Sequence, residues 1–202
     1  MLNSLWGYKI SHKARIGFSI IVPENLEMHD YARIGHLTIC KSLQMLKMEE
    51  NSRIGNLNWI TAFDINNKES FSHRVDRETK LAIGKHTAIT HRHIIDCTEK
   101  ITIGSFTTIA GYGSQFLTHS IDIHESKQDC KPITIGSYCM VGTACVALPG
   151  SSLGDYCILG ANSLLNKNFS ERYRLYGGVP ATEIKKLSEK MQYFSRETGY
   201  IF

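Results

Sequence analysis

The stretch ITIGSYCMVGTACVALPGSSLGDYCILGANSLL, residues 133–165, repeats one pattern every six residues. An apolar side chain returns at the same place in each repeat, at Ile135, Val141, Ala147, Leu153, Leu159 and Leu165. Four residues after each of the first five stands a small side chain, at Cys139, Cys145, Ser151, Cys157 and Ser163. Neither a helical period of 3.6 nor simple strand alternation produces this register. Three short strands per turn of a triangular coil do, because apolar side chains then stack along the axis about 4.8 Å apart.

A longer repeat, an apolar residue followed by glycine, runs through most of the chain. The glycines stand at positions 17, 35, 55, 84, 104, 136 and 154, with gaps of 18, 20, 29, 20, 32 and 18 residues. Self-similarity at a fixed period predicts an all-β solenoid. The two long gaps predict insertions at about 64–79 and 117–132. Insertions of this kind become surface loops that often line the binding face.

The repeat resembles that of the hexapeptide-repeat acyltransferases over about residues 10–180, most clearly at 133–165. The resemblance implies a left-handed parallel β-helix over about 1–180, usually in a trimer, followed by a C-terminal helical tail over 181–202. The left hand follows from the resemblance alone, since general handedness rules favour right-handed crossovers.

Composition limits the function classes only broadly. A chain of 202 residues suits one domain, and we find no run of 18 apolar residues and no signal-peptide pattern, so we expect a soluble cytoplasmic protein. Net charge is +4 and no basic cluster predicts a nucleic-acid partner. Three of the six cysteines occupy the small repeat position, which favours packing over disulfides or zinc.

The second insertion carries the candidate catalytic residue, in the segment QFLTHSIDIH at 115–124. His119 can act as a general base, since an imidazole can take the proton of a hydroxyl that attacks a thioester. Such a base needs a partner for its second nitrogen. Asp122, three residues on, is the first candidate, and Asp96 in the preceding coil is the second. The resemblance implies the same role for His119, because the family's catalytic histidine lies in a similar loop. The alternative is an ordinary solvated loop histidine.

A zinc site is a second chemistry that the histidines allow. His119 and His124 could join His86, His91 and His93 from earlier coils to hold zinc with an open position for water. Gamma-type carbonic anhydrases share the β-helix and bind zinc between subunits. Against this reading, His119 and His124 lie in an insertion rather than in the repeat register.

The tail LYGGVPATEIKKLSEKMQYFSRE favours acyl transfer, because Gly178, Val179, Pro180 and Ala181 resemble the segment that closes the family's β-helix. We expect a terminal α-helix after it, with an apolar stripe of Ile184, Leu187, Met191 and Phe194. The resemblance implies that Lys186 contacts the phosphates of coenzyme A. Ordinary capping of the last coil by a helix with solvated lysines is the alternative.

Coenzyme A would otherwise be held mostly by backbone at coil edges. The candidate positions are Gly142, Thr143, Gly160 and Ala161, where small residues permit close approach. The same positions also satisfy the repeat, so a purely structural role remains open.

These features together predict an acetyl-CoA-dependent O-acetyltransferase that acts on a sugar or glycan precursor by direct transfer. The preference for sugar comes from resemblance to polysaccharide-locus acetyltransferases. We expect no metal and a homotrimer whose active site lies between subunits. The alternatives are an amino-sugar N-acetyltransferase, a zinc hydratase of the gamma carbonic anhydrase type, and a non-catalytic β-helix subunit.

Overall fold

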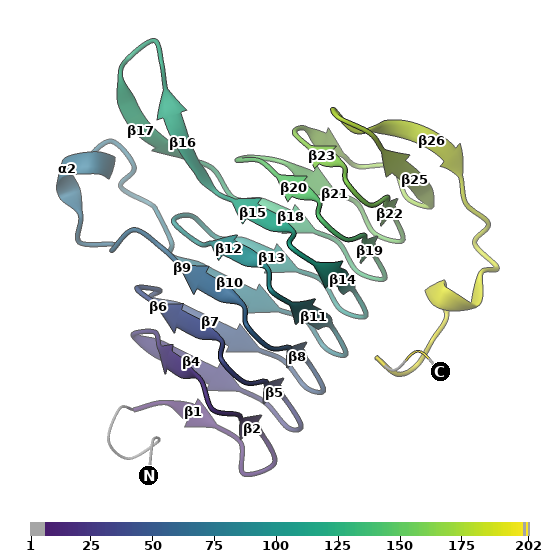
Figure 1. Cartoon of the computed structure of the whole chain (residues 1–202), viewed down its shortest axis with the longest axis horizontal. Helices are drawn as coiled ribbons and strands as arrows, with labels where there is room; N and C mark the ends of the chain where they lie inside the picture. Colours follow the sequence, from purple (N-terminus) through teal and green to yellow (C-terminus); the bar gives the residue numbers. More distant parts are fainter. Residues whose placement is uncertain (1–6, 200, 202) are drawn as a thin grey trace.

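The structure is a computed structural model that describes residues 7–199 and 201, and its strands form the three faces of a parallel β-helix (Figure 1). Residues 1–6 of the predicted β-helix range, and 200 and 202 of the predicted tail, lie outside the described residues. Within these limits no helix is long and apolar enough to span a membrane.

Each turn of the coil contributes one strand to each of three sheets. The first sheet contains β1 (Lys9–Ile10), β4 (Asn25–Met28), β7 (Met45–Met48), β10 (Lys80–Ile83), β13 (Ile101–Ile103), β18 (Ile133–Ile135), β21 (Ser152–Leu153) and β24 (Asn168–Phe169). The second contains β2 (Arg15–Ile16), β5 (Arg33–Ile34), β8 (Arg53–Ile54), β11 (Ala88–His91), β14 (Thr108–Tyr112), β19 (Met140–Val141), β22 (Ile158–Leu159), β25 (Arg174–Gly177) and β26 (Thr182–Lys186). The third contains β3 (Ile20–Val22), β6 (Ile39–Lys41), β9 (Trp59–Thr61), β12 (Ile94–Asp96), β15 (Gln115–Leu117), β20 (Val146–Ala147) and β23 (Leu164–Leu165).

The six-residue register predicts the core correctly. All six of the apolar positions counted from Ile135 are buried, and so are all five of the small positions. Neighbouring coils compensate for side-chain size, since Phe116 pairs in register with Ala147. All six cysteines are free and buried, which confirms packing as their role. A thiol in the small position can also form a hydrogen bond to a neighbouring coil, since Cys139 donates to the carbonyl of Gly154 at 3.0 Å.

The repeat glycines form two columns rather than one. The first three, at 17, 35 and 55, follow strands of the second sheet, and those at 84, 104, 136 and 154 follow strands of the first sheet. Within each column a neighbouring coil approaches closely: a Cβ on Gly17 would lie 2.6 Å from the carbonyl oxygen of Gly35. The gap of 29 residues therefore contains both an insertion and a change of corner.

Both insertions project from the same side of the coil (Figure 1). The first contains the short helix α2 (Lys68–Phe71), capped by the side chain of Asn67. The second is an antiparallel hairpin of β16 (His119–Asp122) and β17 (Lys127–Cys130). It leaves the coil at the corner between the third sheet and the first, directly after β15.

The prediction of a C-terminal α-helix is wrong for the described residues. Thr182–Lys186 instead forms β26, which turns back antiparallel on β25, and only a 3₁₀ turn, η1 (Gln192–Phe194), follows. The predicted apolar stripe is divided as a result: Leu187 and Phe194 are buried, whereas Ile184 and Met191 are exposed.

The packing partner of the tail is an aromatic column at one corner of the coil. His86, Phe106, Tyr138, Tyr156 and Tyr173 stack there with ring centroids 4.7–5.1 Å apart. Phe194 packs edge-on against the last two of these rings. Pairing of β26 with β25 and packing of Phe194 on this column are tertiary contacts, and they override the helical pattern.

Candidate functional site

His119 stands at the start of the hairpin, directly above Asp96 in the preceding coil. Asp96 ends β12, which pairs with β15 so that Asp96 lies opposite Leu117. The chain turns out of the coil two residues later, and this turn carries the imidazole over the carboxylate. His119 Nδ1 and Asp96 Oδ2 are 2.6 Å apart.

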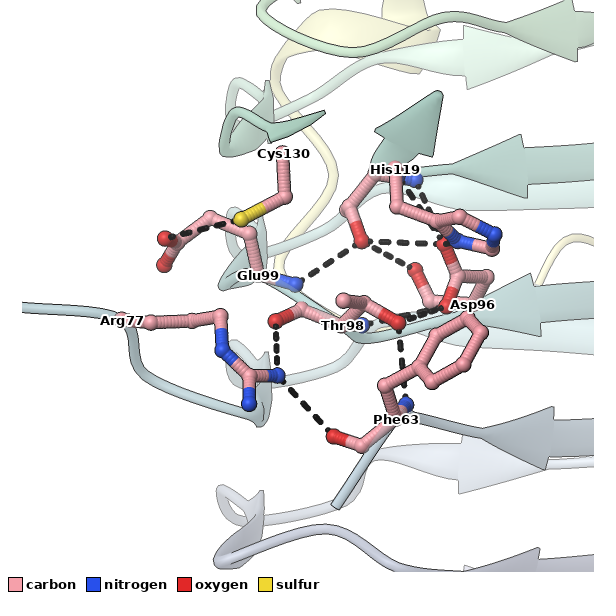
Figure 2. A network of polar contacts seen from close by, with 8 residues as sticks. Phe63, Arg77, Asp96, Thr98, Glu99, His119 and Cys130 are labelled. Carbon is pink, nitrogen blue, oxygen red and sulfur yellow. Dashed lines mark hydrogen bonds and ion pairs between the residues drawn. The ribbon is translucent and has the colours of Figure 1, made fainter. Parts of the chain in front are cut away.

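Asp96 is held by six donors, from three residues, on its two oxygens (Figure 2). Oδ1 accepts from the backbone N–H and the hydroxyl of Thr98, at 3.1 and 2.6 Å. Oδ2 accepts from the N–H and hydroxyl of Thr118 and from the N–H of His119, at 3.0–3.1 Å, as well as from the ring. With so many donors, the carboxylate is fixed as an ionised acceptor. The ring therefore carries its proton on Nδ1, and its lone pair is on Nε2.

The electrostatics of the pair match this geometry. Burial alone would raise the pKa of Asp96, but hydrogen bonds from His119 and Thr98 outweigh it and lower that pKa. The hydrogen bond to Asp96 raises the pKa of His119, against an opposing contribution from burial. Asp96 is only 8% exposed, whereas the His119 side chain retains 31% of its surface. The pair thus consists of a buried anion and a partly accessible base.

Phe63, directly before the first insertion, packs against this pair, and Arg77 within the insertion holds Phe63 in place. The ring of Phe63 packs edge-on against the His119 ring, with centroids 5.0 Å apart. The N–H of Phe63 also donates to the Thr98 hydroxyl at 3.0 Å, and that hydroxyl donates to Asp96. The buried guanidinium of Arg77 holds the segment by donating to the carbonyls of Phe63 and Thr98, at 2.9 and 3.1 Å (Figure 2).

A two-fold hydrogen-bonded ion pair joins the two insertions. Arg74 donates through Nε and Nη2 to both oxygens of Asp129 on β17, at 2.6 and 2.8 Å. These bonds lower the pKa of Asp129 to about 2. Parallel bonds between a guanidinium and a carboxylate fix orientation as well as distance. The hairpin that carries His119 is therefore tied to the first insertion as well as to the coil.

A cavity of about 660 Å³ opens beside the histidine. Its lining combines Leu117 at the end of β15 and hairpin residues, including His119 and Cys130, with Leu148 and Pro149 from the next coil. The second ring nitrogen, Nε2, lies on the far side of the ring from Asp96, and no contact is drawn to it (Figure 2). A neutral imidazole held by a carboxylate at Nδ1 can accept a proton at Nε2.

Asp122 does not orient His119, and its predicted role is corrected. Its Oδ1 accepts the backbone N–H groups of His124 and Glu125, at 2.9 and 3.2 Å, and so closes the hairpin turn. Alternation explains the difference, because His119 and Asp122 are three positions apart on one strand and so point to opposite faces. Asp96 had the weaker sequence signal, because it stands 23 positions before His119 and meets it only through the stacking of coils.

The three coil histidines considered for zinc have separate environments. His86 stacks on Phe106, with centroids 4.8 Å apart, and Nδ1 of His91 accepts the N–H of Asn56 at 2.8 Å. His93 is fully buried, and burial lowers its pKa to about 4. Across residues 7–199 and 201, no three histidine, cysteine, aspartate or glutamate side chains lie close enough together to hold a metal ion.

The predicted coenzyme positions lie at a different corner from His119. Gly142 and Thr143 follow β19, and Gly160 and Ala161 follow β22, at the corner between the second sheet and the third. The two pairs stack closely, since a Cβ on Gly142 would lie 2.6 Å from the N–H nitrogen of Ala161. Lys186 is exposed at the end of β26, paired with Arg174. The chain therefore does not unite these positions with His119 within a single copy.

No protein-family model matches the chain. Among curated proteins, it is 31% identical over 115 residues to YvoF of Bacillus subtilis, an acetyltransferase by assignment, matching 56% of this chain and 64% of that protein. It is 28% identical over 98 residues to the galactoside O-acetyltransferase of Escherichia coli, matching 46% and 48% of the two chains. The matches thus span less than two thirds of these relatives.

Solved structures agree on the fold. The hexapeptide-repeat acetyltransferase VCA0836 of Vibrio cholerae is 30% identical with a TM-score of 0.51, covering 54% of this chain and 63% of that one. It has also been solved with acetyl-CoA. The polysialic acid O-acetyltransferase OatWY gives a TM-score of 0.68 over 94% of this chain and 90% of its own, at 15% identity. The coil described above is the left-handed parallel β-helix of these proteins.

Proposed function

We propose that this chain, which is similar to hexapeptide-repeat acetyltransferases, transfers an acetyl group from acetyl-CoA to a hydroxyl of a sugar or glycan precursor. The observation that carries the proposal is the Asp96–His119 pair, a buried carboxylate 2.6 Å from a partly exposed imidazole beside a cavity.

In this mechanism His119 Nε2 takes the proton of the acceptor hydroxyl as its oxygen attacks the thioester carbonyl. The tetrahedral intermediate then collapses, the carbon–sulfur bond breaks, and the coenzyme thiolate leaves and takes up the proton. Asp96 keeps the ring in the tautomer with its lone pair on Nε2 and stabilises the imidazolium that forms. No covalent intermediate on the protein is needed, so positioning of the two substrates supplies much of the rate.

The predicted coenzyme positions enter the site from a second copy of the chain. His119 lies at one edge of the third sheet, and Gly142 and Gly160 lie at the other edge. Three copies packed through their third sheets would bring one edge of each copy to the opposite edge of the next. An exposed apolar column on that sheet supports this packing, because Ile20, Ile39, Trp59 and Ile94 stack in register and the first, third and fourth are 44–58% exposed.

Coenzyme A would then run along Gly142, Thr143, Gly160 and Ala161, with its phosphates near Lys186. The small residues leave room for pantetheine beside the backbone, and Lys186 is an exposed cation. A cytoplasmic location belongs to the same proposal. Light scattering should give a trimer, and a monomer at micromolar concentration would contradict the shared site.

The proposal is tested by thiol release from acetyl-CoA against a panel of nucleotide sugars and neutral and acidic oligosaccharides, with the acetylated product identified by mass. We expect acceptor-dependent release with the acetyl group on oxygen. Transfer to amino sugars alone would favour the N-acetyltransferase alternative. Absence of release with every acceptor, from a folded trimer that binds acetyl-CoA, would contradict the assignment.

A further inference from the structure

Three arginines form a column on the outer face of the second sheet, near the N-terminal end of the coil. Arg15 pairs in register with Arg33, and Arg33 pairs with Arg53. Residues in register on adjacent strands lie about 4.8 Å apart. The next position in the column is Ala88, so the row of charge ends against a small side chain.

This arrangement is unfavourable by itself. Like charges directly opposite one another on a sheet destabilise it. Burial, together with the charge of Arg33, lowers the pKa of Arg53. Across residues 7–199 and 201, neither Arg15 nor Arg33 makes an ion pair with a carboxylate. Arg15 donates to nearby backbone carbonyls, those of His12 and Ala14, both at 2.8 Å.

The column lines a groove of about 510 Å³, and none of the described residues that line it is acidic. The lining also includes two histidines whose Nδ1 atoms accept backbone N–H groups, His36 from Phe18 at 3.1 Å and His91 from Asn56 at 2.8 Å. A neutral imidazole that accepts at Nδ1 carries its proton on Nε2, so both rings are further donors. The groove therefore offers guanidinium and imidazole donors in a line along the coil axis.

We propose that this groove binds an acidic oligosaccharide, the carboxylate-bearing stretch of the acceptor glycan, along the axis of the coil. A line of guanidinium groups at the strand spacing fits a ligand whose negative charges also repeat along a chain, because guanidinium and carboxylate groups pair through parallel hydrogen bonds. The proposal rests on the proposed function and adds to it the chemical class of the acceptor.

The position of the groove agrees with this role. It follows the same corner as Gly142 and Gly160, where Gly17, Gly35 and Gly55 occupy the equivalent places in earlier coils. The predicted coenzyme positions thus lie toward the C-terminal end of that edge and the groove toward its N-terminal end. Acetyl-CoA and the acceptor glycan would approach His119 of the neighbouring copy from opposite directions.

Binding of tetragalacturonate, measured by calorimetry at low salt and without acetyl-CoA, tests the proposal separately from catalysis. We expect the full-length protein to bind it and to ignore maltotetraose, a neutral chain of equal length. Arg33→Gln should weaken binding about tenfold to a hundredfold, the effect of removing one hydrogen bond to a charged group. Lys190→Gln, which removes an exposed charge outside the groove, should leave binding unchanged.

Three results would overturn the proposal. These are equal binding to the Arg33→Gln variant, equal binding of maltotetraose, and tighter binding of pyrophosphate than of tetragalacturonate, which would indicate a nucleotide site. Arg33 is exposed, so the variant should fold, and melting and light scattering check this. A variant that changes the oligomeric state instead of glycan binding would identify the groove as a subunit contact.

Discussion

Replacing Asp96 by asparagine separates the charge of this residue from its shape. Four donors surround the Oδ2 position and two surround Oδ1. The single oxygen of an asparagine should therefore occupy the Oδ2 position, and its NH₂ group should face Thr98. His119 Nδ1–H then keeps an acceptor, but a neutral one.

The structure gives the size of the expected effects. The N–H of Thr98 loses its acceptor in a buried place, so unfolding should become easier by about 1–3 kcal/mol. A hydrogen bond to a neutral acceptor is weaker than one to a carboxylate by about 1–1.5 kcal/mol, and turnover should fall about tenfold at saturating substrate because the imidazolium is less stabilised.

The pH profile gives the more specific result. A general base must be neutral, so the rate should rise with pH through the pKa of His119, which Asp96 raises above the ordinary value of about 6.5. Asp96→Asn removes the cause of that increase, and the rising limb should move to lower pH. The matched control is Asp122→Asn, which alters only the hairpin turn and should leave the limb in place.

Thiol release measured from pH 5 to 9 for the three proteins decides the matter. If the rate of Asp96→Asn rises over the same pH range as that of the parent protein, the rise does not report the titration of His119 beside Asp96, and the reasoning is refuted. A loss of turnover near 10⁴ would show that the amide NH₂, not the oxygen, faces the ring and imposes the wrong tautomer.

Three further results are expected. Arg74→Gln should cost about 0.5–2 kcal/mol of stability by breaking the link to Asp129, and hydrogen exchange in the hairpin should rise; equal exchange would mean that the link does not hold the hairpin. Lys186→Ala should weaken acetyl-CoA affinity while turnover is largely kept, and an unchanged affinity would remove this residue from the coenzyme site. Metal analysis should find no stoichiometric zinc, and chelation should leave activity intact; one zinc per subunit, lost in His124→Ala, would instead favour the hydratase.

The coil could be predicted from sequence because its periodicity is local. From Ile135 to Leu165 an apolar residue recurs every six positions, and counting in steps of six identifies the buried core residues. The tail could not be predicted in the same way. Ile184, Leu187 and Phe194 have helical spacing, but β26 is held in extended form by pairing with β25, and Phe194 packs from a 3₁₀ turn against rings that distant coils supply.

The sequence predicted one member of the catalytic pair and misplaced the other, because only the first has a local signal. His119 was found because it interrupts the repeat, and its partner was misplaced because closeness along the chain favoured Asp122. Counting by coils rather than by residues would have favoured Asp96, which ends the strand beneath Leu117. Phe63 gave no signal, since an aromatic residue before an insertion has no pattern that links it to a histidine 56 positions later.

The most direct test of the central claim is the turnover of His119→Ala with a reactive acceptor, measured together with its affinity for acetyl-CoA. Turnover should fall by roughly 10²–10⁴, the contribution of one general base. The affinity should change little, because the proposed coenzyme contacts lie on the coil edges of the neighbouring copy. A folded, trimeric His119→Ala protein that turns over at the parent rate would contradict the mechanism.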